Sequence, residues 1–306
     1  MYLRYFNMNE FPFMQTPNTR FYYELSSAHE ALNVLLFSIQ TGEAFVKIVG
    51  EVGSGKTLLC RNLLHQLDHD YISAYIPNPD LSVFALRKVI ANELGILVQP
   101  HMDQHIVMQL ITDKLMEYHA QGKKVILVID EAQVLPEENL ETLRLMTNLE
   151  TESAKLLQIV LLGQPELDQR LNQHKLRQLK QRITFSYYLK PLHRTELASY
   201  LCHRLATAGY MHGNLFTTGA QKLLYRYSRG IPRLINILAH KAMLIAYGKG
   251  KKQVDIKAMY IAAKDCCYFT AEQRWTRNQK MLAATLLMVG IITIAVYLNY
   301  LGWIHW

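Results

Sequence analysis

The sequence predicts an α/β protein, with a core built on a five-stranded parallel sheet and a small helical domain after it. Short apolar runs alternate with helical patterns up to residue 190, which is typical of a parallel sheet covered by helices. After Pro191 the signals for strands nearly vanish, while helical patterns continue. We therefore predict that residues 1–190 form the core and residues 191–270 the helical domain.

The strands of the core are predicted from their apolar and β-branched residues. The third is apolar throughout, so it is expected to be buried on both faces of the sheet. The fifth alternates between apolar and polar residues, which favours a sheet edge. In order, the predicted strands are residues 44–49, 71–76, 125–129, 156–162 and 183–189.

Helices are predicted between these strands and after Pro191. Ser82 is a suitable N-cap for the second helix, and Gly95 a suitable stop. The helices of the core are predicted at residues 57–67, 83–94, 103–119 and 137–150, and those of the helical domain at 195–208, 218–227, 232–247 and 256–263.

The last part of the chain predicts one transmembrane helix over residues 281–303. From Met281 to Trp306 there is no Asp, Glu, Lys or Arg, and a bilayer core needs about 20 apolar residues in a helix. Arg274, Arg277 and Lys280 lie just before it. By the positive-inside rule, the preceding domains are expected in the cytoplasm.

Composition excludes a disordered chain. The 306 residues are 50% hydrophobic and 19% charged, which is enough apolar material for a sizeable core. The formal net charge of +8 is compatible with nucleic acid or with an anionic membrane surface and does not choose between them.

A phosphate-binding loop is predicted directly after the first strand. Residues 50–57 fit the pattern G-x-x-x-x-G-K-[ST] between a predicted strand and a predicted helix. Glycines let backbone N–H groups surround a phosphate, and the following helix directs its positive end toward it. Lys56 would reach the β- and γ-phosphates, and the Thr57 hydroxyl would bind Mg²⁺. The residues expected to contact the nucleotide are Gly50, Glu51, Val52, Gly53, Ser54, Gly55, Lys56, Thr57 and Leu58.

Two carboxylates follow the third predicted strand. Asp130 and Glu131 come directly after the apolar run 125–129, at the carboxyl end of a strand, where ligands bind in open α/β sheets. Asp130 is expected to bind Mg²⁺, and Glu131 to polarise the water that attacks the γ-phosphate. The sequence therefore predicts ATP and Mg²⁺ as the bound groups.

These motifs resemble the AAA+ superfamily, and within it the general secretion pathway protein A (ExeA) group. The resemblance covers about residues 1–265 and includes members that serve type IV pili of the mannose-sensitive haemagglutinin (MSHA) type. Its two nucleotide motifs are general to the superfamily, and their combination with the N-terminal Phe-Pro-Phe segment and with Gly-Gln-Pro-Glu-Leu is more specific. The resemblance rests on several stretches of the chain. They are Glu10-Phe11-Pro12-Phe13, Thr16-Pro17-Asn18, Phe21-Tyr22, Gly50 to Arg61, Ile129 to Gln133, Leu162-Gly163-Gln164-Pro165-Glu166-Leu167, Leu179 to Ile183 and Gly230-Ile231-Pro232-Arg233.

The resemblance implies a helical lid over the nucleotide and sites shared between the subunits of a homo-oligomer. By position, Gln164 is similar to the sensor that contacts the γ-phosphate or the water, and Arg233 to the second sensor in the lid. Arg182 is similar to the arginine finger that reaches the neighbouring subunit's nucleotide, with Arg177 as the rival. Arginine suits this role because its planar fork stays charged.

The same resemblance implies that residues 1–40 cover the nucleotide. Phe11, Phe13, Phe21 and Tyr22 are candidates to lie against the adenine, and packing in the core is the alternative for each.

The expected function is a membrane-anchored ATPase of the bacterial inner membrane that drives assembly of an MSHA-type type IV pilus or a type II secretion apparatus. Its partners would be inner-membrane proteins of that machine. Secretion-type relatives continue into a periplasmic domain that binds cell wall; the sequence ends at Trp306, so no direct peptidoglycan role is expected.

Two alternatives remain open at this stage. One is an ATP-dependent DNA-binding regulator similar to transposition ATPases, with Arg226, Arg229, Lys249, Lys251 and Lys252 on phosphates; no helix-turn-helix or basic arm supports it, so nucleic acid is not the expected partner. The other is a scaffold that binds ATP and scarcely hydrolyses it.

Overall fold

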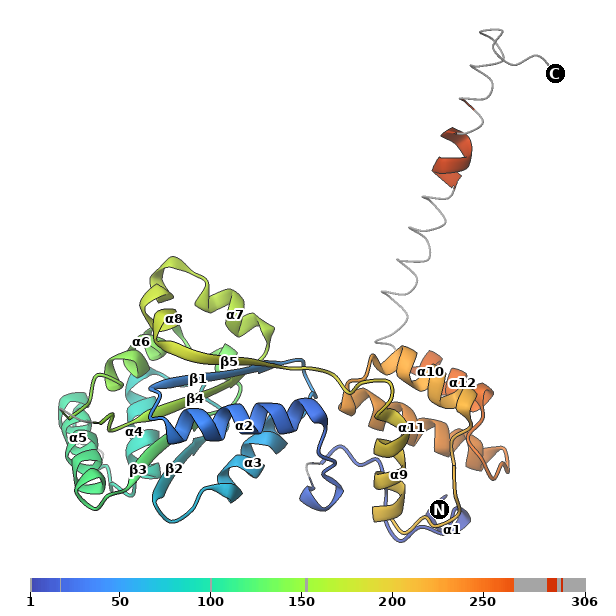
Figure 1. Cartoon of the computed structure of the whole chain (residues 1–306), viewed down its shortest axis with the longest axis horizontal. Helices are drawn as coiled ribbons and strands as arrows, with labels where there is room; N and C mark the ends of the chain where they lie inside the picture. Colours follow the sequence, from blue (N-terminus) through green and yellow to red (C-terminus); the bar gives the residue numbers. More distant parts are fainter. Residues whose placement is uncertain are drawn as a thin grey trace.

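The computed structural model describes residues 2–16, 18–99, 101–151, 154–266, 285–290 and 293. An α/β unit lies on one side of the molecule and a helical unit on the other (Figure 1). The N-terminus lies beside the helical unit, although the chain continues from there into the α/β unit (Figure 1).

The sheet has five parallel strands, as predicted. They are β1 (Phe45–Gly50), β2 (Tyr71–Ile76), β3 (Lys124–Ile129), β4 (Gln158–Gly163) and β5 (Ile183–Leu189), in the order β2-β3-β4-β1-β5. β5 lies at an edge, as its alternating pattern predicted. The carboxyl ends of β1, β4 and β3 therefore meet side by side at one edge of the sheet.

Helices cover both faces of the sheet. One face packs against α2 (Ser26–Gln40) and α3 (Lys56–Gln66), and the other against α4 (Val83–Glu93), α5 (Gln104–Ala120), α6 (Glu137–Met146), α7 (Pro165–Leu171) and α8 (Arg177–Arg182). The period of two in β3 explains this division: Ile126 and Val128 belong to the first core, and Val125, Leu127 and Ile129 to the second. Short 3-10 turns, η2 (Ala132–Val134) and η3 (His174–Leu176), connect elements on the second side.

The helical unit consists of α9 (Leu197–Thr207), α10 (Thr218–Ser228), α11 (Pro232–Gly248) and α12 (Ile256–Asp265). Side chains cap two of these helices: Thr217 accepts a hydrogen bond from Ala220 N, and Asp255 accepts one from Ala258 N. The apolar core of this unit is continuous with the core between the sheet and α2. The four helices predicted after Pro191 agree with these within a few residues.

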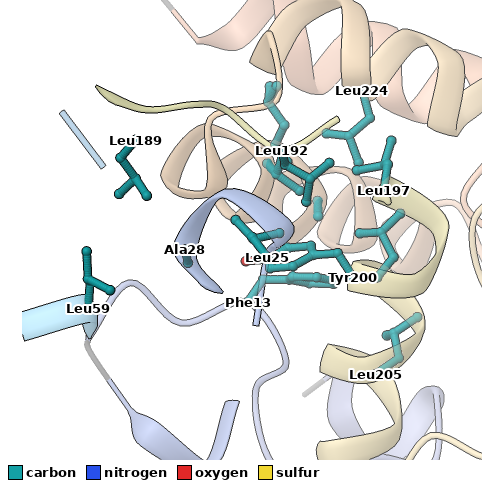
Figure 2. Packing of buried hydrophobic residues seen from close by; sticks show 14 of the residues in the cluster. Phe13, Leu25, Ala28, Leu59, Leu189, Leu192, Leu197, Tyr200, Leu205 and Leu224 are labelled. Carbon is teal, nitrogen blue, oxygen red and sulfur yellow. The ribbon is translucent and has the colours of Figure 1, made fainter. Parts of the chain in front are cut away.

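The N-terminal segment packs onto the helical unit. Helix α1 (Tyr2–Tyr5) contacts α11, and the turn η1 (Thr19–Phe21) contacts α9. The Tyr2 hydroxyl lies 2.9 Å from His240 Nδ1. Figure 2 shows Phe13, Leu25 and Tyr200 in the buried cluster that joins this segment, α2 and α9.

The structure contradicts the prediction of a transmembrane helix. Among the residues that the structure describes, no helix is long and apolar enough to cross a membrane. Residues 285–290 and Thr293 are helical, and this is far short of the 20 or so residues that a bilayer core requires. The rest of the predicted range 281–303 lies outside the described residues.

Candidate functional site

The loop between β1 and α3 is closed by glycines and by Lys56. Gly53 and Gly55 have φ angles of 79° and 106°, in the left-handed region that favours glycine. Lys56 is only 5% exposed, and its Nζ donates hydrogen bonds to the carbonyl oxygens of Gly50 at 2.8 Å and Glu51 at 3.2 Å. The ammonium group therefore lies inside the curve of the loop.

Burial and nearby carboxylates act on Lys56 in opposite directions. Burial lowers its pKa, and the negative charges of Glu131 and Asp130 raise it in part. The ammonium group donates to two carbonyl oxygens, and four acidic side chains act on its charge: Glu131, Asp130, Glu51 and Glu166. This arrangement holds a positive charge ready for an anionic ligand.

Asp130 and Thr57 meet at the start of α3. Thr57 Oγ1 donates a hydrogen bond to Asp130 Oδ2 at 2.7 Å, and Asp130 is only 3% exposed. Burial raises the pKa of Asp130, while the hydrogen bonds from Thr57 and from the Glu131 backbone N–H lower it. A hydroxyl and a carboxylate oxygen at this distance are a pair of ligands of the kind that Mg²⁺ prefers.

Glu131 is held by two glutamine side chains. Its Oε2 accepts hydrogen bonds from Gln164 Nε2 at 2.9 Å and from Gln133 Nε2 at 2.5 Å. Gln133 Oε1 in turn accepts from the Gln164 backbone N–H at 3.0 Å. Burial opposes ionisation of Glu131, but these two hydrogen bonds and the charge of Lys56 lower its pKa overall. The side chain is thereby kept ionised and oriented.

A cavity of about 390 Å³ opens in front of the loop. Its wall comes from the phosphate loop, from Glu131, from the N-terminal segment and from the helical unit. The lining residues are Met14, Gln15, Thr16, Asn18, Val52, Gly53, Gly55, Lys56, Thr57, Leu58, Glu131, Tyr200, Arg204, Pro232, Arg233 and Asn236.

The loop fits a phosphate by two further observations. Ser54 Oγ is buried and has no hydrogen-bond partner among the described residues, so the loop holds an unused polar atom. A Cβ on Gly50 would lie 2.8 Å from this Oγ, so glycine is required for the close turn. Thr57 and Asp130 supply oxygen ligands beside it, and the residues present thus fit a nucleotide triphosphate with Mg²⁺.

Arg233 connects the helical unit to the loop. Its backbone N–H donates to Gly53 O at 3.3 Å, and a Cβ on Gly53 would lie 2.4 Å from Arg233 Cβ. The side chain lines the cavity next to Val52, which is 50% exposed there. At the other side of the loop, Glu51 Oε1 accepts a hydrogen bond from the Tyr188 hydroxyl at 3.1 Å.

Comparison with known proteins agrees with this geometry. A family model described as an AAA domain matches residues 39–171. The general secretion pathway protein A of Aeromonas hydrophila is 39% identical over 290 residues, which are 95% of this chain and 53% of that protein. Residues 39–171 therefore form an AAA domain. The whole chain spans about half the length of this curated relative.

Solved structures show that the fold of this chain is shared with other proteins. The ORC2 protein of Aeropyrum pernix in its ADP form superposes with a TM-score of 0.61 at 15% identity, covering 83% of this chain and 71% of that one. Cdc6p of Pyrobaculum aerophilum superposes with a TM-score of 0.62 at 18% identity, covering 79% and 67% of the two chains. At these identities the likeness concerns the fold alone.

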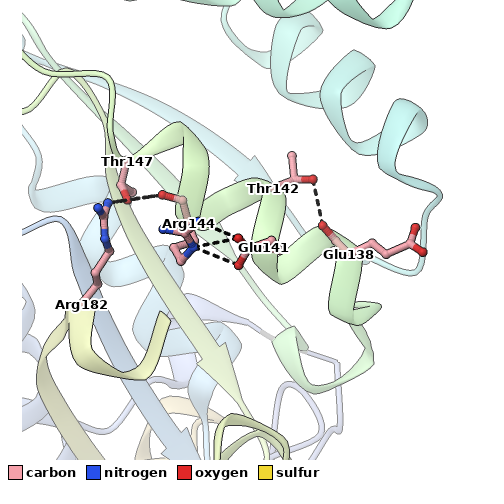
Figure 3. A network of polar contacts seen from close by, with 6 residues as sticks. All are labelled: Glu138, Glu141, Thr142, Arg144, Thr147 and Arg182. Carbon is pink, nitrogen blue, oxygen red and sulfur yellow. Dashed lines mark hydrogen bonds and ion pairs between the residues drawn. The ribbon is translucent and has the colours of Figure 1, made fainter. Parts of the chain in front are cut away.

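The structure does not bring Arg182 or Arg177 to the cavity of their own chain. Arg182 precedes β5 at the end of the sheet opposite the loop, about 20 Å away over the length of that strand. Its Nη1 donates to Thr147 Oγ1 at 2.8 Å, at the end of α6 (Figure 3). Arg177 is exposed at the start of α8. Neither arginine is among the residues that line the cavity.

Sequence analysis missed several residues of the site. Gln133 lies two positions after Glu131, in a stretch that the resemblance included. Its nearness to Glu131 in the sequence could therefore have identified it. Tyr200, Arg204 and Asn236 gave none, since they lie on helices of the other unit. The aromatic candidates for adenine do not form the wall: Phe13 and Phe21 are buried in the core, and the N-terminal segment lines the cavity with Met14, Gln15, Thr16 and Asn18.

Proposed function

We propose that this protein binds ATP with Mg²⁺ in the cavity, hydrolyses it, and uses the cycle to drive assembly of a secretion or pilus machine. The observation that carries the ATPase part is the convergence of Lys56, Thr57, Asp130 and Glu131. Thr57 donates a hydrogen bond to Asp130, and the negative charges of Asp130 and Glu131 both raise the pKa of Lys56.

In this proposal each side chain has a separate task. Backbone N–H groups of the loop and the ammonium group of Lys56 bind the phosphates, and Mg²⁺, held by Thr57 and Asp130, would neutralise negative charge on them. Glu131 accepts a hydrogen bond from the attacking water and orients it. Gln164 donates to the γ-phosphate or to that water. Arg233 links the state of the phosphates to the position of the helical unit, which acts as a lid.

The proposal includes a homo-oligomer in which the sites are shared. Arg182, or its rival Arg177, would reach the γ-phosphate bound by the adjacent subunit, where a guanidinium stabilises charge in the transition state. The position of Arg182 at the end of the sheet remote from its own loop supports this arrangement.

The secretion or pilus role rests on the relative. The Aeromonas hydrophila protein is named for the general secretion pathway, and this chain resembles its group over the AAA+ part. We propose that the partners are inner-membrane proteins of a type II secretion apparatus or an MSHA-type type IV pilus, and that the ATPase part acts on the cytoplasmic side of the bacterial inner membrane.

The ATPase part is tested with Glu131→Gln, which keeps the size of the side chain and removes its charge. We expect ATP binding to persist, and release of inorganic phosphate to fall by about 10²- to 10⁴-fold. Glu138→Gln, on the exposed surface of α6, is the matched control and should hydrolyse ATP at the original rate. Unchanged hydrolysis by Glu131→Gln would refute the role of this residue.

The assembly part needs a cellular test. The gene is deleted in its host and replaced by the original sequence, Glu131→Gln or Glu138→Gln. Surface pili and secreted proteins are then quantified. Loss of either output with Glu131→Gln alone would support the proposal, and normal pili and secretion would contradict it. Affinity capture of the protein with and without ATP, followed by identification of the captured proteins, would name the partners.

A further inference from the structure

Arg204 is a buried arginine without a carboxylate partner among the described residues. It lies on α9 and is 8% exposed. Its Nε donates to Pro12 O at 2.7 Å, its Nη1 to Phe21 O at 3.4 Å and its Nη2 to Met14 O at 3.3 Å. All three acceptors are backbone carbonyl groups of the N-terminal segment. Each guanidinium nitrogen of Arg204 thus donates one hydrogen bond to that segment.

Aromatic rings hold the same guanidinium in place. Its carbon lies 5.0 Å from the centre of the Phe21 ring and 5.9 Å from that of Tyr200, within the range of cation–π attraction. Burial lowers the pKa of Arg204, yet a guanidinium stays charged in proteins. A charged group taken out of water without a counter-ion is costly, and this cost indicates a requirement beyond packing.

The backbone that Arg204 holds forms one end of the nucleotide cavity. Met14, Gln15, Thr16 and Asn18 line that end from the N-terminal segment, while Gly55, Lys56 and Thr57 line the phosphate end. The lid completes the wall with Tyr200, whose hydroxyl donates to Asn236 Oδ1 at 2.8 Å. The end of the cavity away from the phosphates thus combines apolar and aromatic surface with neutral amide and hydroxyl groups.

This chemistry suits a nucleobase. Of the described residues that line the cavity, one is a carboxylate, Glu131, and it lies at the phosphate end. Arg204 also lines the cavity, but each of its three guanidinium nitrogens donates a hydrogen bond to a carbonyl group, that of Pro12, Phe21 or Met14. An uncharged, flat and hydrogen-bonding group such as a purine matches what is left.

We infer that Arg204 is a positioning residue for the base end of the nucleotide: it fixes residues 12–16 and Phe21 against the lid and thereby gives the site its preference for adenine. The inference rests on the proposed binding of ATP in this cavity. In this inference, base selection depends on a residue of the lid that does not contact the phosphates. Because Arg204 belongs to the lid, binding of the base is also coupled to the position of the lid.

The test separates the base end from the phosphate end. Affinities for ATP, CTP and inorganic tripolyphosphate, which has no base, are measured on the full chain for the original protein, Arg204→Met and Arg204→Lys. Arg226→Gln, an exposed position on the neighbouring lid helix α10, is the control. Thermal unfolding of each variant verifies that it is folded.

For Arg204→Met we expect the affinity for ATP to fall about tenfold or more, that for tripolyphosphate to stay within about twofold, and the ratio of ATP to CTP affinity to fall toward one. Arg204→Lys keeps the charge but loses the fork, so it should be intermediate, and Arg226→Gln should match the original protein. If Arg204→Met does not fold, Arg204→Lys alone decides, by the same ratio.

Three results would overturn the inference. They are an unchanged ratio of ATP to CTP affinity in both Arg204 variants, an equal loss of ATP and tripolyphosphate affinity, and an original protein that binds ATP no better than tripolyphosphate. The last would leave the phosphate site intact. Failure of the proposed function itself would give a different result. The original protein would bind neither ATP nor tripolyphosphate, or Lys56→Ala would bind both with the affinity of the original protein.

Discussion

Glu131 shows how one carboxylate is prepared for a single task. Its backbone φ angle of 52° turns the residue out of the line of β3, and Gln133 and Gln164 approach its Oε2 from different elements. An oxygen that already accepts two hydrogen bonds is well oriented but less basic. Orientation is thus gained at the cost of proton affinity.

This predicts a measurable effect of Gln133→Ala. Removing one donor raises the pKa of Glu131 toward its ordinary value, because that hydrogen bond stabilises the ionised form. Hydrolysis requires ionised Glu131, so the acidic limb of the pH–rate profile should move to higher pH. Gln178→Ala, exposed on α8, serves as the control. Superimposable acidic limbs for Gln133→Ala and the control would contradict the prediction.

At the scale of elements, the phosphate loop and α11 approach each other so closely that a methyl group would separate them. Gly53 and Gly42 have nearly the same φ angle, 79° and 80°. A Cβ on Gly53 would lie 2.4 Å from Arg233 Cβ, whereas one on Gly42 would meet nothing within 4 Å. Substitution of either glycine by alanine would therefore strain the backbone in the same way, but only the substitution at Gly53 would also create a steric clash.

We predict that Gly42→Ala lowers the stability by about 1–2 kcal/mol, the usual cost of a left-handed conformation. Gly53→Ala should lower it further because of the clash with Arg233 Cβ, and only Gly53→Ala should weaken ATP binding. The added methyl group must displace Arg233 and the start of α11. Thermal unfolding and titration with ATP measure the two effects. Equal ATP affinities for the two variants would mean that the contact between loop and lid is dispensable for binding.

A second contact between the units lies at the N-terminus of α2. Glu196, just before α9, accepts hydrogen bonds through its Oε1 from Ser26 N at 3.1 Å and Ser26 Oγ at 2.9 Å, and through its Oε2 from His193 N at 2.8 Å. Burial opposes ionisation, but these hydrogen bonds lower the pKa of Glu196 overall. A helix is thus capped by a residue that lies 170 positions away in the sequence.

For Glu196→Ala we predict a loss of about 0.5–1 kcal/mol at neutral pH, at the lower end of capping values because the site is partly exposed to water. The folded pKa lies below the unfolded one, so this stabilisation is present above the unfolded pKa and is lost as the pH falls through the folded pKa. The difference in melting temperature from the original protein should shrink below about pH 4.5. A difference independent of pH would exclude the carboxylate as its source.

At the scale of the whole molecule, the proposal that sites are shared between subunits predicts complementation between inactive variants. Lys56→Ala cannot bind the phosphates, and Arg182→Ala cannot complete the neighbouring site. In mixed oligomers, a site with Lys56 from one subunit and Arg182 from the other is intact. Mixtures should therefore recover hydrolysis that neither variant shows alone, and the same mixing with Arg177→Ala tests the rival. No recovery at any ratio would place the finger within its own subunit.

Much of the α/β unit was predictable, because its signals are local. Each strand is an apolar run, and the phosphate loop carries its own pattern between a strand and a helix. Helix α2 was missed within a segment assigned to covering the nucleotide, although Ala31, Leu35 and Ile39 have helical spacing. The predicted transmembrane helix is corrected in the described part of the chain.

The contacts that give the site its shape were not predictable from local patterns. Arg204 finds its acceptor, Pro12 O, across 192 positions of the chain, and nothing in the composition of α9 marks that choice. Gln164 meets Glu131 across 33 positions, because β4 lies beside β3. Such pairings follow from the order of strands and the docking of the lid.

The placement of the N-terminal segment has a consequence for how the protein is made. Tyr2 and Pro12 leave the ribosome first, but their partners His240 and Arg204 follow 238 and 192 residues later. At ordinary speeds of translation this delay is on the order of ten seconds or more. Through that interval the apolar side chains of Tyr2, Phe6 and Phe13 lack the surface that buries them. The phosphate loop at residues 50–57 is thus synthesised long before the residues of the helical unit that line the cavity with it.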